Sequence, residues 1–464
     1  AYLVSAACFV LGLHLMNSPA RARRGNTVSA AGMTLAIVVT LAFVAHQGTI
    51  TGAGWAIVIA GILVGGVAGL IGARKVQMTD MPQLVSLFNA AGGGAAALVA
   101  ITEFVQVVTQ HSGDLSTRAT VATVLDVIIG AVTFSGSLIA AGKLQGVITS
   151  APVTFPAVRL LNGALLLGAV GGGAYLIWGD HRSVVALVLI LVLGLTFGVT
   201  MVMPIGGADM PVVISLLNAF TGLSAAATGV ALNNPALIVA GMIVGASGSI
   251  LTNLMAVAMN RSIPAIIAGG FGGGGVVAGA SGAGEHAGTV RATNAADVAV
   301  QLAYARQVVI VPGYGMAVAQ AQHAVRELAK ALEARGVQVS YAIHPVAGRM
   351  PGHMNVLLAE ADVPYDQLRE MDDINPEFPR TDVALVIGAN DVTNPAAKTN
   401  PGSPIYGMPI LNVEDAKSVV VIKRSMNPGF AGIDNELYTH PNTAMLFGDA
   451  KSVVSDLTAE LSNI

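Results

Sequence analysis

Nine apolar runs, separated by short polar breaks, fill the first 260 residues of the chain. A helix needs about 20 apolar residues to cross the hydrocarbon core of a bilayer. The first run is marginal in length, the fourth is long, and the others are close to this value. The pattern therefore predicts a polytopic α-helical membrane domain with about nine spans, at approximately residues 1–16, 28–46, 53–73, 83–108, 120–141, 157–178, 183–203, 211–231 and 235–258.

The pattern changes after a Gly-rich stretch at residues 262–288. Short apolar strands then alternate with helical spacing, which is typical of an α/β doubly wound (Rossmann-like) parallel sheet. We therefore divide the chain into a membrane domain (1–261), a flexible connector (262–288) and a ligand-binding domain (289–464). The expected strands are 307–311, 337–343, 382–387, 410–413 and 418–422, and the expected helices are 316–335, ending at Gly336, and one near 451–461.

Charged residues are distributed unevenly between these parts. Only 11% of all residues are charged, and the mean hydropathy is +0.70, whereas soluble domains carry about 25% charged residues. Residues 1–260 contain nine Lys or Arg and six Asp or Glu, and residues 261–464 contain fourteen and twenty. The apolar excess therefore belongs to the first part, which indicates a lipid bilayer as its surroundings, with no sign of nucleic-acid binding.

Loop cations gather on one side of the predicted spans. With nine spans, the opposite side carries only Arg118 and Arg182. The positive-inside rule places the cation-rich side in the cytoplasm, and the second domain follows on that side. We therefore expect a multi-pass protein of the inner or plasma membrane with a cytoplasmic second domain. The cations of the cytoplasmic side are Arg21, Arg23, Arg24, Arg74, Lys75, Lys143, Arg159 and Arg261.

Small residues recur within some spans. Gly61, Gly65 and Gly69, and likewise Gly241 and Gly245, have the four-residue spacing that lets membrane helices approach closely. We expect both sets to form seams between helices.

The single cysteine, Cys8, lies in an apolar run, where a packing role is expected. One cysteine excludes an internal disulfide and a cysteine-based metal site, and we predict no metal site. The sequence opens inside an apolar stretch with no preceding basic region, so no signal peptide is visible.

A glycine-rich turn, Gly313-Tyr-Gly315-Met-Ala-Val318, joins the first predicted strand to a helix. Glycines at such a turn let the backbone approach a pyrophosphate, which then lies at the amino terminus of the helix. The motif alone is weak, but its place in a strand–turn–helix–strand unit favours a dinucleotide over a mere tight turn.

The end of the second predicted strand bears on which dinucleotide binds. An NAD site places an acid there to bind the ribose 2′-hydroxyl, but the sequence reads Ala342-Ile343-His344-Pro345. A 2′-phosphate requires cations, and Lys423-Arg424 follows the strand 418–422. The pattern therefore predicts NADP, with a solvated strand end as the alternative explanation of the two cations.

Three further segments are dense in Gly, Pro, Asn and charged residues: 348–353, 388–395 and 427–432. The second and third lie at or just beyond the carboxyl ends of predicted strands, where open α/β sheets bind ligands.

At this point the sequence resembles the β subunit of the proton-translocating nicotinamide nucleotide transhydrogenases over essentially its whole length. The motifs that carry the resemblance are Asp80-Met-Pro-Gln-Leu, Thr133-Phe-Ser-Gly-Ser137 with Gly142-Lys-Leu, Asp209-Met-Pro through Asn218, Pro312-Gly-Tyr-Gly-Met-Ala-Val-Ala-Gln, Arg349-Met-Pro-Gly-His-Met-Asn, Ile387-Gly-Ala-Asn-Asp391 and Val421-Ile-Lys-Arg-Ser-Met.

The resemblance implies a Si-side-specific NAD(P)⁺ transhydrogenase that couples inward proton movement to hydride transfer from NADH to NADP⁺. NADP(H) would bind to this chain. NAD(H) would bind to a separate α subunit that also carries the remaining membrane helices, in a two-fold assembly of αβ units.

By the same resemblance, Lys423 and Arg424 would hold the 2′-phosphate and the loop from Gly313 would line the pyrophosphate. Residues 349–354 would cover the cofactor, with Asp391 near the nicotinamide. The full set of expected cofactor-binding residues is Gly313, Tyr314, Gly315, Met316, Ala317, Val318, His344, Arg349, Met350, Gly388, Asn390, Asp391, Lys423, Arg424, Ser425, Gly429, Phe430, Ala431 and Gly432.

Strongly polar side chains inside a membrane are candidates for function. The resemblance singles out Asn89, Ser137, Asp209 and Asn218 for the proton pathway. The family pattern has a titratable His where this sequence has Asn89, and an amide does not titrate near neutral pH. His46, in the second span, is therefore the expected substitute.

Each of these groups also has a structural explanation. His46 would face interfacial water at a helix end, Ser137 would bond a backbone carbonyl, and Asp209 would cap a helix. Glu103 and Asp126 lie near the predicted ends of spans on the non-cytoplasmic side. Solvation costs little there, so a structural role is favoured for both.

Two other functions are compatible with these patterns. One is an ion channel or transporter gated by a cytoplasmic NADP-sensing domain, which binds the nucleotide without turnover. The other is a membrane-anchored reductase of a small substrate that moves no protons. Coupling between hydride transfer and proton flux distinguishes the transhydrogenase from both.

Overall fold

The computed structural model describes residues 1–464 except 49, 111–116, 151, 179–182, 261, 268–288, 351, 404 and 428–431. It divides into two compact units, the first built chiefly from Ala1–Thr252. Residues 268–288, most of the expected connector, lie outside the described residues.

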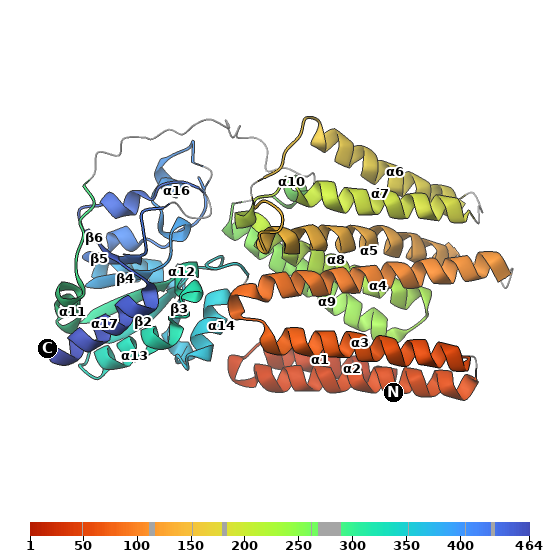
Figure 1. The fold of residues 1–464 in the computed structure, drawn as a ribbon, viewed down its shortest axis with the longest axis horizontal. Coiled ribbons are helices and arrows are strands. Elements are labelled where there is room, and N and C mark those ends of the chain that lie inside the picture. Colours follow the sequence, from red (N-terminus) through yellow and green to blue (C-terminus); the bar gives the residue numbers. More distant parts are fainter. Residues whose placement is uncertain are drawn as a thin grey trace. The chain divides into compact units, whose positions relative to one another are not determined.

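Among the described residues, the apolar runs form nine consecutive helices (Figure 1). Eight of these are long and apolar enough to cross a membrane, and α1, with 15 residues, is shorter. The second helix begins at Pro19, so Arg21, Arg23 and Arg24 lie in its first turns rather than in a loop. The helices are α1 (Tyr2–Met16), α2 (Pro19–Gln47), α3 (Gly52–Lys75), α4 (Met81–Gln110), α5 (Thr117–Leu144), α6 (Val158–Trp178), α7 (Val184–Val202), α8 (Met210–Ala231) and α9 (Pro235–Ala258).

Two of these helices lie at the centre of the first unit. α5 packs along α4, α7 and α8, and α4 also packs along α8. In both α5 and α8, other parts of the chain bury 61% of the residues in the most apolar stretch of the helix. In α3 they bury none. Polar side chains on the facing sides of α4, α5 and α8 are therefore enclosed by protein.

The two predicted glycine seams differ. A Cβ atom added to Gly241 would lie 2.4 Å from the backbone nitrogen of Ala226, and one added to Gly222 would lie 2.3 Å from that of Gly245. The backbones of α8 and α9 therefore touch along the predicted seam. The three glycines of α3 have nothing within 4 Å, so the close contact expected there is not made within the described part of this chain.

The described residues of the second unit form a six-stranded parallel sheet with strand order β3-β2-β1-β4-β5-β6. The order reverses between β1 and β4, as in doubly wound folds, and the predicted fold class is confirmed. The strands are β1 (Gln307–Pro312), β2 (Gln338–Ile343), β3 (Leu368–Glu370), β4 (Val383–Ile387), β5 (Ser418–Lys423) and β6 (Thr443–Phe447). The helices outside the nine spans are α10 (Ile263–Ile267), α11 (Ala295–Ala303), α12 (Tyr314–Val318), α13 (Gln322–Glu333), α14 (His353–Glu360), α15 (Met371–Ile374), α16 (Ala396–Thr399) and α17 (Ala450–Asn463).

Both faces of the sheet are covered. Alternate strand residues, among them Val309, Ala384 and Val421, pack in one core with Phe378 and Tyr438. The residues between them are equally buried, on the side where α13 and α17 contact β2 and β5. Strands covered on both faces read as continuous apolar runs, which explains why several were recognisable from the sequence.

The helix predicted at 316–335 is interrupted. α12 ends at Val318, Gln320 has φ +50°, and α13 begins at Gln322. A residue in the left-handed region cannot continue a right-handed helix, so the prediction of one continuous helix was wrong. α13 ends at Glu333, and the turn that follows closes at Gly336, which has φ +82°, so the end predicted at Gly336 was three residues late.

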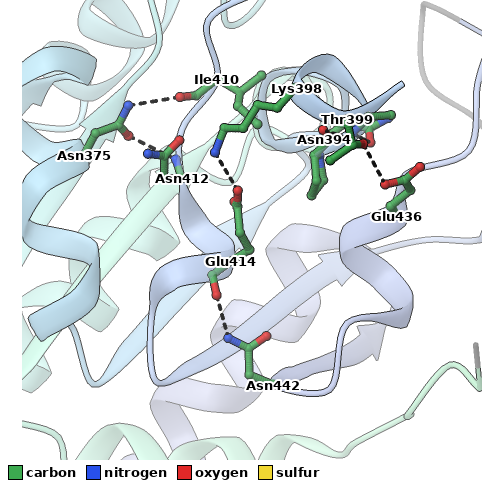
Figure 2. Close-up of polar contacts among 11 residues, drawn as sticks. Asn375, Asn394, Lys398, Thr399, Ile410, Asn412, Glu414, Glu436 and Asn442 are labelled. Carbon is green, nitrogen blue, oxygen red and sulfur yellow. Dashed lines mark hydrogen bonds and ion pairs between the residues drawn. The ribbon is translucent and has the colours of Figure 1, made fainter. Parts of the chain in front are cut away.

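The strand predicted at 410–413 does not form, although Ile410 and Leu411 are buried. Asn375 donates through Nδ2 to the carbonyl of Ile410 at 3.0 Å and accepts from the N–H of Asn412 at 3.0 Å (Figure 2). The N–H of Leu411 donates to the carbonyl of Val392 at 2.9 Å. Because these partners occupy the backbone groups, the segment is buried without joining the sheet.

Candidate functional site

The glycine turn after β1 packs directly on the turn after β4. The N–H groups of Gly313 and Gly315 donate to the carbonyls of Ile387 and Gly388, each at 2.9 Å. A Cβ atom on Gly315 would lie 2.7 Å from the Cα of Gly388, which itself has φ +64°. The glycines are therefore required by the approach of the two turns. These turns lie at the strand-order reversal, which is where doubly wound sheets bind ligands.

The loop 348–353 folds onto Tyr314. The guanidinium of Arg349 lies 4.3 Å from the centre of the Tyr314 ring, and the ring of His353 meets the same ring edge-on at 6.2 Å. The two predicted residues Tyr314 and Arg349 are thus brought together. The contact is of the cation–π type, which favours Arg over Lys at this position.

His353 presents a buried donor. Its Nδ1 accepts from the N–H of Arg349 at 3.1 Å, and burial together with the positive charge of Arg349 lowers the pKa of His353 to about 4. The neutral ring therefore carries its hydrogen on Nε2. This Nε2 is buried without a partner among the described residues.

His344, predicted to bind the cofactor, directly follows β2. Its Nδ1 accepts from the N–H of Val346 at 3.2 Å, and its Nε2 contacts the carbonyl of Pro409 at 2.8 Å. Burial lowers the pKa of His344 to about 4, so the ring is neutral and donates through Nε2. Both nitrogens are used, so the side chain holds the loop after β2 in place.

Lys423 ends β5 in a half-buried position. Its ammonium donates to the carbonyl of Asn427 at 2.7 Å and lies 4.7 Å from the centre of the Tyr438 ring. Burial lowers the pKa of Lys423, and the negative charges of Asp391 and Asp434 act in the opposite direction. The cation is thus held at the carboxyl end of β5, with neighbours from the segments after β4, after β5 and before β6.

Asn390 lies at the centre of a polar cluster beyond β4. Its Oδ1 accepts from the hydroxyl of Tyr438 at 2.7 Å, and its carbonyl accepts from Nδ2 of Asn435 at 2.9 Å. Burial raises the pKa of Tyr438, so the phenol remains a donor. The Nδ2 of Asn390 is buried without a partner among the described residues. Tyr438 and Asn435 were not predicted, since no motif marks them.

Polar contacts brace the loop that follows (Figure 2). Lys398 pairs with Glu414 at 2.7 Å, and the hydroxyl of Thr399 donates to Glu436 at 3.3 Å. Nδ2 of Asn394 donates to the carbonyl of Asp434 at 3.0 Å. The segment after β4 is therefore anchored to the segments before β5 and before β6.

The missing acid and the two cations, which together favoured NADP over NAD, lie at different places in the sheet. The missing acid belongs to the end of β2, whereas Lys423 and the exposed Arg424 follow β5. β1 and β4 lie between them, so three strand spacings, or about 14 Å, separate the two places. The argument for a 2′-phosphate therefore rests on the two cations.

The remaining predicted residues differ in accessibility. Met316 and Ala317 have fully buried side chains, so only their backbone can face a ligand. At least partly exposed are Val318, Met350, Ser425 and Gly432. Outside the described part of the chain lie Gly429, Phe430 and Ala431.

In the first unit, Asn89 of α4 contacts α8. Its Nδ2 donates to the carbonyl of Ile214 at 3.4 Å, and its carbonyl accepts from the hydroxyl of Thr221 at 3.5 Å. Asn218 lies between these two positions along α8 and is partly buried. The structure thus places the two predicted asparagines at the same level of the α4–α8 interface.

Ser137 of α5 is fully buried. Its carbonyl accepts from the hydroxyl of Ser86 on α4 at 3.0 Å, and its own hydroxyl has no partner among the described residues. The expected bond from this hydroxyl to a backbone carbonyl is therefore not found there.

Asp209 immediately precedes α8, but its side chain makes no capping hydrogen bond, so the capping explanation was wrong. His46 lies in the last turn of α2 with an exposed side chain.

The structure contradicts the expectation that Asp126 is a solvated residue near a span end. Its side chain is 0% exposed. The hydroxyls of Ser224 and Thr228 on α8 donate to its two carboxylate oxygens. The structural role expected for Asp126 was based on its place along α5, and its partners could not be predicted because they lie about a hundred residues away in the chain.

A family model and two known proteins match nearly the whole chain, and all three carry the same description. The family model described as NAD(P) transhydrogenase beta subunit matches residues 1–460. Two relatives from Rhodospirillum rubrum, one of them from a defined strain, are both described as NAD(P) transhydrogenase subunit beta. Each is 49% identical to this chain over 466 residues, which cover 100% of this chain and 98% of the relative.

Proposed function

The chain belongs to the NAD(P) transhydrogenase beta subunit family, and from this premise we propose that it binds NADP(H) and couples hydride transfer to proton movement. The family and the eight membrane-type helices make it a multi-pass membrane protein that works with nicotinamide nucleotides and an α subunit. In the proposal, NADH on the α subunit reduces NADP⁺ held at the turns after β1 and β4, and protons move inward.

The polar groups around the turns after β1 and β4 suit a dinucleotide phosphate. Two buried donors, Nε2 of His353 and Nδ2 of Asn390, have no partner among the described residues. A nucleotide offers many oxygen acceptors, and an unmatched buried donor is costly. Lys423 adds a positioned cation at the carboxyl end of the neighbouring strand β5. This match between unpartnered donors, a held cation and a fold that binds nucleotides is the observation that carries the proposal.

The strand order suggests how the cofactor lies. If Lys423 and Arg424 hold the 2′-phosphate, the adenosine half lies toward β5 and the rest of the molecule extends across β4 and β1. The loop that carries Arg349 and His353 then covers the part over β1. The nicotinamide ring itself supplies the hydride chemistry, and the protein binds it, orients it and excludes water.

Proton coupling in this scheme is allosteric. NADH and NADPH share the same redox ring, so hydride exchange between them has little driving force. A proton that crosses the membrane supplies about 2.3 kcal/mol per 100 mV. This energy can act only by changing the relative affinities for NADP⁺ and NADPH in different states of the protein.

The family and the loop cations support the rest of the arrangement. We place the nucleotide domain in the cytoplasm because most loop cations lie on that side of the spans. The transfer would be Si-side specific, and two αβ units would assemble around a two-fold axis. The unpacked face of α3 is available to lipid or to helices of the α subunit.

The test is reconstitution with the α subunit in sealed vesicles. Reduction of an NADP⁺ analogue by NADH is followed together with internal pH, with and without an imposed proton gradient. Added nucleotides reach only complexes whose nucleotide domain faces outward, so the forward reaction should carry protons out of the vesicle. We expect a gradient that is acidic inside to accelerate the reaction, and the internal pH to rise as NADP⁺ is reduced. Hydride transfer that ignores the gradient would contradict coupling, and ion flux without turnover would favour the nucleotide-gated channel.

A further inference from the structure

Asp126 is the only carboxylic acid with a fully buried side chain in the described parts of α1–α9. It lies nine residues after Thr117, the first residue of α5, and is therefore about 13 Å along the helix. α5 has 28 residues and is about 42 Å long, so Asp126 lies about a third of the way along it. A hydrocarbon core is about 30 Å thick, so a core centred on the helix contains this carboxyl. Burying an acid inside a membrane is costly, which makes Asp126 a candidate for function.

Few charges surround this carboxyl. α7 and α8 contain no ionisable side chain, α6 carries Arg159 and Tyr175, and α4 carries Glu103. On α5 itself, Arg118 lies about 12 Å and Lys143 about 25 Å away along the helix axis. No described cation forms an ion pair with the carboxyl.

The surroundings of Asp126 suit both of its protonation states. The hydroxyls of Ser224 and Thr228 donate to the two oxygens of the ionised form. A hydroxyl both donates and accepts, so either one can rotate to serve the protonated form. An ion pair with a cation would hold the acid in its ionised form, and a purely apolar pocket would hold it neutral. Hydroxyl partners do neither.

Asp126 also lies next to a line of polar side chains. Asn218, Thr221, Ser224 and Thr228 are spaced by three or four residues, so they share one side of α8. Thr221 bonds the carbonyl of Asn89 on α4, and the last two bond the carboxyl. Ser224 and Thr228 are one helical turn apart on α8. Each donates to a different oxygen of the carboxylate, so the two oxygens have their partners at two different levels along α8. A carboxyl placed in this way can receive a proton on one oxygen and release it from the other.

We propose that Asp126 is the proton-carrying acid of the membrane unit, with Ser224 and Thr228 as its positioning residues. The proposal rests on the proposed proton-coupled function. In each cycle a proton from one side adds to a carboxylate oxygen and forms the neutral acid. The other side then removes one proton and restores the carboxylate. Asp126 thus performs the titration that Asn89, at the predicted position, cannot perform.

The experiment uses the αβ complex in sealed vesicles. Asp126→Asn keeps the size of the side chain but cannot release a proton. We expect proton flux across the membrane and the coupled hydride transfer to fall about 100-fold, the lower end of what a positioned proton-transfer group contributes, with NADPH binding unchanged. Asp126→Glu should retain part of the flux. Glu103→Gln, the matched loss of the other acid on α4 and α5, should leave the flux unchanged.

A second set of variants keeps the acid and changes its partners. Thr228→Val should move the pH profile of proton flux to higher pH, because loss of a donor disfavours the ionised acid. Thr196→Val, at an exposed hydroxyl of α7, should not move it. Infrared difference spectra between high and low pH should contain the carbonyl band of a protonated carboxyl, and Asp126→Asn should remove it.

The outcomes separate cleanly. A wild-type ratio of protons to hydride in Asp126→Asn would overturn the proposal, and so would loss of flux in Glu103→Gln with normal flux in Asp126→Asn. An unmoved pH profile in Thr228→Val would remove the positioning role. If the wild-type complex itself shows no coupling, the proposed function fails first.

Discussion

Replacing Lys423 by Ala tests the cofactor assignment most directly. The ammonium is half-buried and is held by the carbonyl of Asn427 and the ring of Tyr438. A 2′-phosphate would therefore meet a cation that is already in position, and binding would cost little additional side-chain entropy. The ammonium has three donors, so it can keep its bond to Asn427 while it binds the phosphate.

The magnitude follows from this geometry. A hydrogen bond to a charged group is worth about 1.5–3 kcal/mol. The half-buried position of Lys423 favours the upper part of this range, so we expect NADP⁺ to bind about 30- to 150-fold more weakly in Lys423→Ala. Arg424 is exposed, and its pairing with a phosphate is screened by solvent. Arg424→Ala should therefore cost about fivefold, corresponding to about 1 kcal/mol.

The assay is displacement of bound NADPH from the purified αβ complex, followed by the fluorescence of NADPH. NADP⁺ and NAD⁺ are compared as competitors, because both then report on the same site. NAD⁺ lacks the 2′-phosphate, so its weaker displacement should be nearly unaffected. Lys451→Ala removes the same charge from the exposed first turn of α17 and is the control for net charge. Equal losses for NADP⁺ and NAD⁺ in Lys423→Ala would refute the assignment.

Three further outcomes are expected for the second unit. The pKa values of His344 and His353 are lowered from 6.5 to about 4, so the unfolded chain binds more protons than the folded one between these values. Stability should then fall as pH falls from about 6.5 to about 4, by up to about 3 kcal/mol per histidine; a pH series of denaturant melts checks this, and His353→Asn should lower the slope by about one proton. Gly388→Ala adds a Cβ atom 2.4 Å from a backbone carbon at φ +64° and should abolish NADPH binding, whereas Gly336→Ala, with φ +82° and open space, should cost only about 1–2 kcal/mol and leave binding intact. Asn375→Ala leaves two backbone groups without their partner and should destabilise the unit by about 2 kcal/mol or more in the same melts, and a loss below 0.5 kcal/mol would contradict its bracing role.

The spans and most of the strands were predictable because their signals are local. Membrane helices need a minimum apolar length, and buried parallel strands read as continuous apolar runs, so both appear in a window of neighbouring residues. The break at Gln320 and the capture of residues 410–412 by Asn375 have no such signal. Both depend on a single residue that acts against the local pattern, and the second depends on a partner 35 residues away.

In the candidate site, too, some features were predictable from the sequence and others depended on contacts between distant residues. The sequence by itself determined the family, the two kinds of domain, the glycine turn after β1 and the cations after β5, because motif spacing and composition are properties of the chain alone. Only the tertiary structure decided that Arg349 covers Tyr314, that His344 is used up by backbone groups, and that Asp126 faces Ser224 and Thr228. The physical reason is that an acid's environment depends on the groups packed around it, and here those groups come from a helix that follows 98 residues later.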